Sequence, residues 1–294
     1  MTDPSDTPNE PQATVSRRGA LADLAALTAS SLLGVAGLAA APARAQSARH
    51  ELPAGAPAPH GPMPPADGPR VAMLVYDRMV LLDLVGPQTV LNVARCQIDL
   101  VARTAEPVAT DLGIAVTPTA TFASYRHAPD VVFVPGGLVG SLTAMQDDAT
   151  LDWLRAAAEP ARYVTSVCTG SLVLGAAGLL RGYRATSHWG VRDLLPILGA
   201  TPSPDRVVED RGRITGGGVT AGIDFGLVLA ERLVDRETAE RAQLIVEYAP
   251  DPPFAVGTPE LAGADRVAEA RGRRVWMDEQ ARLAAEAAAR KLAI

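Results

Sequence analysis

The chain has 294 residues, of which 48% are hydrophobic and 20% charged, and its formal net charge is −6. This composition is typical of a soluble globular protein and is long enough for one large domain or two small ones. The mild acidity argues against nucleic acid as a partner, because proteins that bind nucleic acids present basic surfaces.

The first 45 residues have the features of an export signal. Arg17 and Arg18 precede a weakly apolar stretch, and Ala43-Arg44-Ala45 supplies an A-x-A cleavage site. Paired arginines before a mild apolar stretch indicate a twin-arginine signal. We therefore expect the twin-arginine translocase as a partner during export and the periplasm as the location.

A membrane anchor is the alternative interpretation of this segment. Asp23 and the many small residues make the stretch poorly hydrophobic, so we expect no stable membrane anchor. Residues 46–68 are rich in Pro, Ala and Gly, which predicts a disordered linker between the signal and the folded part.

From residue 69 onward, β-type apolar runs alternate with helical patterns. Strands are predicted at 70–76, 98–102, 131–134, 162–165 and 184–189, with hairpins at 107–117 and 207–215. Helices are predicted from 83 or 86 to 94, and at 149–161, 171–177, 191–198, 218–233 and 236–248. The alternation predicts an α/β fold with a mostly parallel sheet, helices on both faces, and the site at the strand carboxyl ends.

Residues 69–260 are thus expected to form one domain. Residues 261–294 are rich in Ala, Arg and Glu, which predicts a C-terminal helical extension. Because its apolar residues are small, we expect the extension to lie across the surface or against a partner subunit.

Cys168 lies in the segment Ser166-Val167-Cys168-Thr169-Gly170, between a β-type run and a predicted helix. A small residue two positions before a nucleophile and a glycine two positions after it are typical of a strand–elbow–helix turn. The amides at the start of the helix would lower the pKa of the thiol and favour the reactive thiolate. Cys168 is therefore a candidate nucleophile; the alternative is a small buried residue at a strand–helix junction. Cys96 is predicted to be a core or junction residue, and both cysteines are expected to be free thiols.

Two further segments are expected beside Cys168. Gly136 and Gly137 follow a predicted strand, where paired glycines can form an anion-binding nest or an oxyanion hole, or simply a tight turn. Asp83 lies among leucines just past the first strand. A carboxylate in that setting must be hydrogen-bonded or functional, and it can also serve as a helix N-cap.

Two other motifs carry weaker signals. His188 follows the predicted strand after the elbow helix, where it is either a base for the cysteine or a partly buried structural residue. Gly216-Gly217-Gly218 opens a helix, but its spacing fits neither G-x-G-x-x-G nor a P-loop. The four histidines are scattered along the chain, so no metal site is expected.

Taken together, these segments resemble the DJ-1/PfpI superfamily and, within it, the isonitrile hydratase group. The resemblance extends over about residues 70–260 and is carried by Leu82-Asp83-Leu84-Val85-Gly86-Pro87, Val134-Pro135-Gly136-Gly137, residues 163–172, residues 184–189, residues 215–224 and Glu247-Tyr248-Ala249-Pro250.

The resemblance implies a flavodoxin-like α/β sandwich and a homodimer. It implies that Cys168 is the nucleophile and that Asp83, where many superfamily members have a glutamate, is its acid/base partner. Thr169 would assist through its hydroxyl or its backbone N–H, and Gly136 and Gly137 would line the anion-binding side.

The reaction implied is hydration of an isocyanide, a small-molecule substrate, to an N-substituted formamide through a Cys168 thioimidate, without a cofactor. One alternative is a DJ-1-like glyoxalase or deglycase. Another is a periplasmic thiol or ligand sensor without enzymatic activity. His188 matches a position that other branches of the superfamily use as a partner of the cysteine.

Overall fold

The computed structural model describes residues 67–294, so the predicted export signal and residues 46–66 of the predicted linker lie outside the described residues. A seven-stranded sheet forms the centre of the described part. Its spatial order is β10 (Val207–Asp210), β11 (Arg213–Gly216), β7 (Tyr163–Val167), β6 (Val131–Val134), β1 (Arg70–Leu74), β2 (Gln97–Ala102) and β5 (Ala120–Thr121). Every neighbouring pair is parallel except β10–β11, which confirms the predicted mostly parallel sheet.

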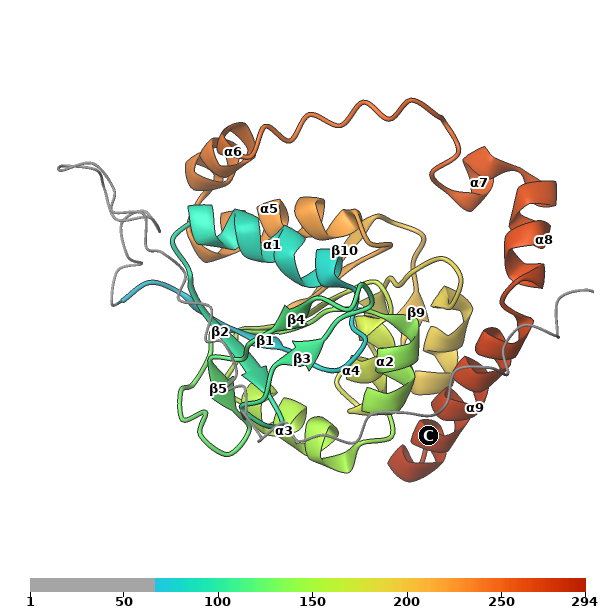
Figure 1. Cartoon of the computed structure of the whole chain (residues 1–294), viewed down its shortest axis with the longest axis horizontal. Coiled ribbons are helices and arrows are strands. Elements are labelled where there is room, and N and C mark those ends of the chain that lie inside the picture. The colour runs from blue at the N-terminus through green and yellow to red at the C-terminus, as the bar shows by residue number, and fades with distance from the viewer. Residues whose placement is uncertain (1–66) are drawn as a thin grey trace, which may run out of the picture. The chain divides into compact units, whose positions relative to one another are not determined.

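Helices cover both faces of this sheet (Figure 1). One face packs against α1 (Leu81–Val93), α5 (Ala221–Leu233) and α6 (Arg236–Ile245). The other packs against α2 (Leu138–Ala144), α3 (Asp148–Ala158), α4 (Gly170–Ala176), the 3-10 helix η1 (Arg192–Leu198) and α9 (Val275–Leu292). Strands buried on both faces are apolar throughout, as β6 is, because alternate side chains enter the two cores. This is the flavodoxin-like sandwich expected from the sequence.

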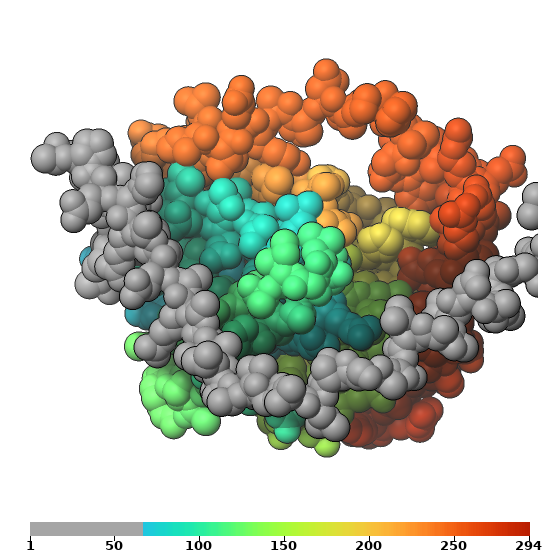
Figure 2. All heavy atoms as spheres, viewed as in Figure 1, coloured from blue at the N-terminus to red at the C-terminus, as the bar shows by residue number. Residues whose placement is uncertain are grey.

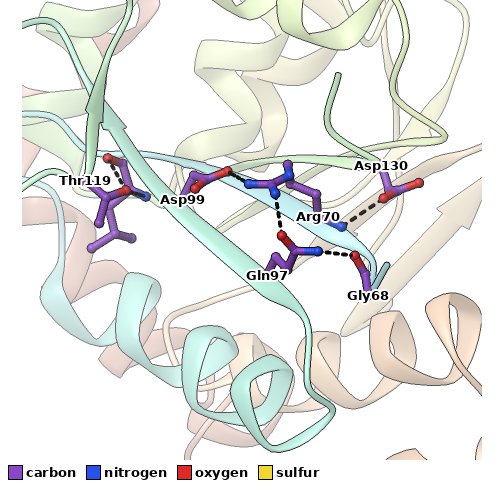
Figure 3. A network of polar contacts seen from close by, with 7 residues as sticks. Gly68, Arg70, Gln97, Asp99, Thr119 and Asp130 are labelled. Atoms are coloured by element: carbon purple, nitrogen blue, oxygen red, sulfur yellow. Dashed lines mark hydrogen bonds and ion pairs between the residues drawn. The ribbon is translucent and has the colours of Figure 1, made fainter. Parts of the chain in front are cut away.

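A polar network ties the amino ends of the central strands together (Figure 3). The Arg70 guanidinium donates hydrogen bonds to Asp99, at 2.8 Å, and to Gln97 on the neighbouring β2. The Arg70 backbone N–H donates to the Asp130 carboxylate, at 2.8 Å, just before β6. Gln97 in turn donates to the carbonyl of Gly68. These contacts fix the register of β1 between its neighbours at the edge of the sheet opposite the site.

The carboxyl ends of β1, β6 and β7 meet at the point where the connections change face. The chain leaves β1 for α1 on one face, whereas it leaves β6 and β7 for α2 and α4 on the other face. In parallel α/β sheets such a switch point opens a crevice where ligands bind. The segments that bear Asp83, Gly136 and Cys168 leave these three strands.

The structure corrects several predicted elements. The predicted strand 184–189 contains only β8 (Arg184–Ala185), which pairs with β9 (Thr201–Pro202) outside the main sheet. The predicted hairpin at 107–117 is present as β3 (Val108–Ala109) and β4 (Ala115–Val116). Helix α2 and strand β5 were not predicted, because short amphipathic elements leave little periodicity in the sequence.

The C-terminal extension consists of α7 (Pro259–Ala262), α8 (Ala264–Gly272) and α9. Alanines along α9 are buried against α4 and η1 of the same chain, including Ala281 and Ala285. Small side chains let the helix approach the domain closely, which explains the alanine-rich sequence. Within residues 67–294, no helix is long and apolar enough to cross a membrane.

Candidate active site

Cys168 occupies the elbow between β7 and α4. Its φ angle of +57° lies in the left-handed region, which is uncommon for a residue other than glycine. Its N–H donates to the carbonyl oxygens of Gly216 and Gly217, at 3.1 and 2.7 Å, at the carboxyl end of β11. Its carbonyl accepts hydrogen bonds from the Ser171 and Ser187 hydroxyls. The backbone is therefore held in a strained conformation that fixes the direction of the side chain.

Asp83 reaches the same place from the first turn of α1. The carboxyl is fully buried, and its Oδ2 accepts a hydrogen bond of 2.9 Å from the Gly136 N–H. Asp83 does not cap its helix: the N–H of Leu81 instead donates to the carboxylate of Asp111, at 2.9 Å. The N-cap alternative considered from the sequence is therefore wrong, and the carboxyl is directed into the site.

The carboxyl of Asp83 titrates near neutrality. Burial raises its pKa to about 7, and the negative charge of Asp111 adds to the rise. The Gly136 N–H and a hydrogen-bonding interaction with the Cys168 thiol oppose the rise without cancelling it. A carboxyl with such a pKa is present in both protonation states near pH 7, so it can donate a proton and take one back.

The thiol of Cys168 is also buried, with 4% of the residue exposed. Burial raises the pKa of the thiol well above its usual value, and the nearby negative charge of Asp83 raises it further. The Thr169 backbone N–H has the opposite effect. The start of the helix was expected to lower the thiol pKa, but burial and the charge of Asp83 outweigh that effect. Two acidic groups that share a buried site cannot both ionise readily.

Gly136 and Gly137 both contact this pair, but their amides are already engaged. The Gly136 N–H binds the Asp83 carboxyl, and the Gly137 N–H donates to the Thr169 hydroxyl, at 2.9 Å. The anion that this turn binds in the structure is therefore the protein's own carboxylate. An oxyanion-hole role for the two amides stays a prediction.

Gly136 stands at the most crowded point of the site. A Cβ on Gly136 would lie 2.6 Å from Asp83 Oδ2, 2.6 Å from the Thr169 nitrogen and 2.7 Å from the Cys168 Cβ. All three neighbours are held by the backbone or by a buried helix, so none can move aside cheaply. The position therefore requires glycine for space.

We expect Gly136→Ala to lower the free energy of unfolding by about 1–3 kcal/mol, the usual range for overpacking a buried site. We also expect at least about a 100-fold loss of any Cys168-dependent activity, because the reacting groups would be displaced. Urea denaturation and turnover measure the two effects. Gly257→Ala is the matched control, since a Cβ there meets nothing within 4 Å. Equal effects of the two substitutions would contradict this account.

His188 is not joined to the Cys168–Asp83 pair. Its Nδ1 accepts a hydrogen bond from the Gly190 N–H, and its ring contacts Trp189. Burial lowers its pKa to about 4, and the positive charge of Arg274 lowers it further. The imidazole is therefore neutral at pH 7 and packs under the C-terminal helices. A role as a base for the cysteine stays a prediction that this geometry does not favour.

Two polar groups beside the site escaped the sequence analysis. Tyr76, just after β1, donates a hydrogen bond of 2.6 Å to the Pro135 carbonyl and lies 3.0 Å from the Ser141 hydroxyl. Ser141 on α2 is fully buried and lies 2.8 Å from the Thr169 hydroxyl. A polar residue four positions after the glycine pair was a signal for Ser141, but α2 itself was not predicted.

The glycine-rich segment before α5 has a structural explanation. Asp224 in the first turn of α5 accepts hydrogen bonds from Arg206, at 2.6 Å, and from the Tyr248 hydroxyl, at 3.0 Å. These contacts hold the start of α5 against β10 and the end of α6. They fix the Gly216 and Gly217 carbonyls that bind the elbow. Within the described residues, no group of three acidic, histidine or cysteine side chains could hold a metal ion.

A cavity of about 560 Å³ reaches Gly137, but its lining does not include Asp83, Gly136 or Cys168. Its lining includes Val80, Asp111 and Gly137, which flank Asp83 and Gly136 in the chain or contact the start of α1. This volume is in the range of small-molecule sites.

These features define a class: a flavodoxin-like α/β protein with a cysteine at a nucleophile elbow and a buried carboxyl beside it. The family model for DJ-1/PfpI proteins matches residues 69–232. The chain belongs to the DJ-1/PfpI family.

Among its relatives, isonitrile hydratase from Pseudomonas putida is 52% identical over 206 residues, which are 69% of this chain and 89% of that protein. The crystal structure of a ThiJ/PfpI family protein from Pseudomonas syringae has 44% identity and a TM-score of 0.72, and the match covers 81% of this chain and 98% of that one. DJ-1beta from Drosophila melanogaster, at 22% identity and a TM-score of 0.58 over 62% of this chain and all of that one, shares the fold.

Proposed function

We propose that the protein is an isonitrile hydratase-like enzyme, which adds water to an isocyanide to give an N-substituted formamide. The observation that carries the proposal is the Asp83 carboxyl, buried beside the Cys168 thiol with a pKa near 7. The identity of 52% to an isonitrile hydratase supports it. A carboxyl of this kind suits a reaction that needs one group to act as an acid and then as a base.

The first half of the reaction joins the substrate to sulfur. The proton of the Cys168 thiol passes to the Asp83 carboxylate, and the protonated carboxyl delivers it to the terminal carbon of R–N≡C. The sulfur forms a bond to the same carbon, which gives the thioimidate R–N=CH–S. The sulfur thus supplies the electron pair, the carbon gains one hydrogen, and Asp83 returns to the carboxylate.

The second half consumes water. The Asp83 carboxylate takes a proton from water as the oxygen bonds to the thioimidate carbon, and the nitrogen receives that proton from the carboxyl. The C–S bond then breaks as the new hydroxyl becomes a carbonyl, and its proton returns to the sulfur. The products are R–NH–CHO and the Cys168 thiol, so the atoms of one water molecule account for the difference from the substrate. No step of this sequence calls for a cofactor.

Formamide production from a simple isocyanide, such as cyclohexyl isocyanide, tests the proposal. We expect the purified protein to form the N-substituted formamide, measured by chromatography and mass spectrometry. Methylglyoxal is the comparison substrate. Consumption of methylglyoxal without formamide production would overturn the proposal in favour of a glyoxalase or deglycase. Oxidation of Cys168 at low peroxide with no turnover of either compound would favour a sensor.

We also propose that the protein is a homodimer. Residues 249–258 after α6 are all exposed, and Figure 2 shows an opening between this arm and the helices beneath it. The arm and its flanks carry exposed apolar side chains: Leu244, Ile245, Phe254, Val256 and Leu261. Exposed apolar side chains that gather on one arm and its flanks favour a protein interface. Light scattering should give twice the chain mass, and a monomer at micromolar concentration would contradict the proposal.

Export to the periplasm through the twin-arginine translocase is likewise proposed, on the sequence of residues 1–45. The two arginines carry the proposal, so replacing both Arg17 and Arg18 by lysine should retain the protein in the cytoplasm. Cell fractionation measures this outcome. Unchanged export of the double variant would contradict the twin-arginine route.

A further inference from the structure

A chain of buried hydrogen bonds leads from the end of β1 to the elbow. The Tyr76 hydroxyl donates to the Pro135 carbonyl, at 2.6 Å, and lies 3.0 Å from the Ser141 hydroxyl. The Ser141 hydroxyl lies 2.8 Å from the Thr169 hydroxyl, which accepts from the Gly137 N–H at 2.9 Å. Ser141 and Thr169 are both buried. In the proposed reaction none of these hydroxyls has a role.

The direction of this chain follows from its two ends. Each hydroxyl has one proton to donate. The Pro135 carbonyl can only accept, so it takes the proton of Tyr76. Ser141 must then donate to the Tyr76 oxygen, and Thr169 must donate to Ser141. The Gly137 N–H donates to the Thr169 oxygen, which completes a chain in which every proton is assigned.

The direction of the hydroxyl chain affects the neighbouring thiol of Cys168. A hydrogen-bonding interaction of the Thr169 side chain with the Cys168 sulfur favours the thiolate, but it is the smallest of the effects on the thiol pKa. In the chain assigned above, the single proton of the Thr169 hydroxyl is directed to Ser141 instead. The Thr169 backbone N–H is then the donor that remains for the sulfur.

We propose that Tyr76 is a positioning residue that fixes the direction of this hydroxyl chain and so keeps the Thr169 proton away from the Cys168 sulfur. Without the Tyr76 oxygen, Ser141 can donate to Thr169, and Thr169 can donate to the sulfur. The tyrosine thereby keeps the resting thiol protonated, with the proton that the proposed reaction delivers to the substrate. The proposal extends the proposed function, but its test requires no turnover.

The groups that surround the thiol allow the effect of Tyr76 on the thiol pKa to be measured separately from effects of charge. The charged or titratable groups that act on Cys168 are Asp83 from α1 and Tyr76 from the end of β1. The contacts from the end of β11 and from the segment after β8 are uncharged, namely the carbonyls of Gly216 and Gly217 and the Ser187 hydroxyl. Burial raises the pKa of Tyr76, so this residue is neutral over the whole range in which the thiol is assayed. Removing its hydroxyl changes hydrogen bonding without changing charge.

The experiment measures the alkylation rate of Cys168 by iodoacetamide as a function of pH, in a Cys96→Ala background. We expect Tyr76→Phe to lower the thiol pKa by about one unit, since a hydrogen bond to the charged form favours it, and so to speed alkylation about tenfold below that pKa. Tyr125→Phe is the matched control: its ring packs against Trp153 and His127 away from the elbow, and it should change nothing.

A second pair of variants tests whether the effect of Tyr76 passes through the Thr169 hydroxyl. If the Thr169 hydroxyl transmits the effect, Tyr76→Phe should not shift the thiol pKa when Thr169→Val is already present. Thermal melts check that each variant is folded. An unchanged or raised thiol pKa in Tyr76→Phe would overturn the proposal, and so would a shift that persists in the Thr169→Val background. Absence of isocyanide turnover would instead count against the proposed function and would leave the pKa result interpretable.

Discussion

Cys168→Ala is expected to reduce formamide production by about 10⁴-fold or more, the scale seen when an enzyme loses its nucleophile. The thioimidate cannot form without the sulfur, and the remaining groups can only position the substrate. Single-turnover mass spectrometry of the wild-type protein should detect a covalent adduct on Cys168 that the variant lacks.

Cys96→Ala is the matched control for this substitution. Cys96 is a buried free cysteine, like Cys168, and burial raises its pKa to about 12. It lies at the end of α1 before β2, where its N–H donates to the Leu91 carbonyl. We expect Cys96→Ala to retain turnover. Undiminished turnover by Cys168→Ala would remove the basis of the proposed mechanism.

Asp83→Asn is expected to lower turnover by about 10²–10⁴-fold, the usual contribution of a general acid–base group. The amide can still accept a hydrogen bond from the Gly136 N–H, so the site keeps its shape. It cannot carry the proton from the sulfur to the substrate carbon. In the wild type, turnover should therefore depend on pH around 7, where the Asp83 carboxyl titrates. A variant with the same rate and the same pH profile would show that Asp83 carries no proton.

The same substitution is expected to stabilise the fold above pH 7. The pKa of Asp83 is 3.8 when unperturbed and about 7 in the folded protein, so the folded state binds more protons between these values. Wild-type stability should therefore be fully present below about pH 4 and fall as the pH rises to 7. With asparagine this slope disappears, and the gain at pH 8 is on the order of 2–4 kcal/mol. Urea denaturation at pH 5 and pH 8 measures the free energy of unfolding of both proteins. If the wild type and Asp83→Asn lost the same stability between these pH values, the burial argument would be contradicted.

Much of the site could be predicted because its signals are local. The elbow is encoded within five residues around Cys168, and Asp83 stands out as an acid among leucines. Parallel topology then brings both to one edge of the sheet. The partners Tyr76 and Ser141 could not be predicted, because their contacts arise only when α2 packs beside the end of β1.

The errors also have physical causes. The segment 184–189 was predicted as a strand because it lies between two predicted helices, but its polar groups make hydrogen bonds outside a strand ladder. The Thr186 N–H donates to the Thr215 hydroxyl, and the Ser187 hydroxyl donates to the Cys168 carbonyl.

The expected lowering of the Cys168 thiol pKa was wrong for a different reason. Sequence shows that a helix begins after Cys168, but it does not show how completely the residue is buried beside a carboxyl.

The burial of Cys168 restricts which molecules can reach its sulfur, and narrow molecules are favoured. A folded thiol oxidase or a glutathione molecule needs open access to a sulfur, and a residue that is 4% exposed denies it. The N≡C group of an isocyanide is linear, uncharged and one atom wide at its reacting end. The same packing that raises the thiol pKa therefore protects the cysteine from disulfide exchange while it admits a thin electrophile. Reactivity here is governed by steric access as much as by acidity.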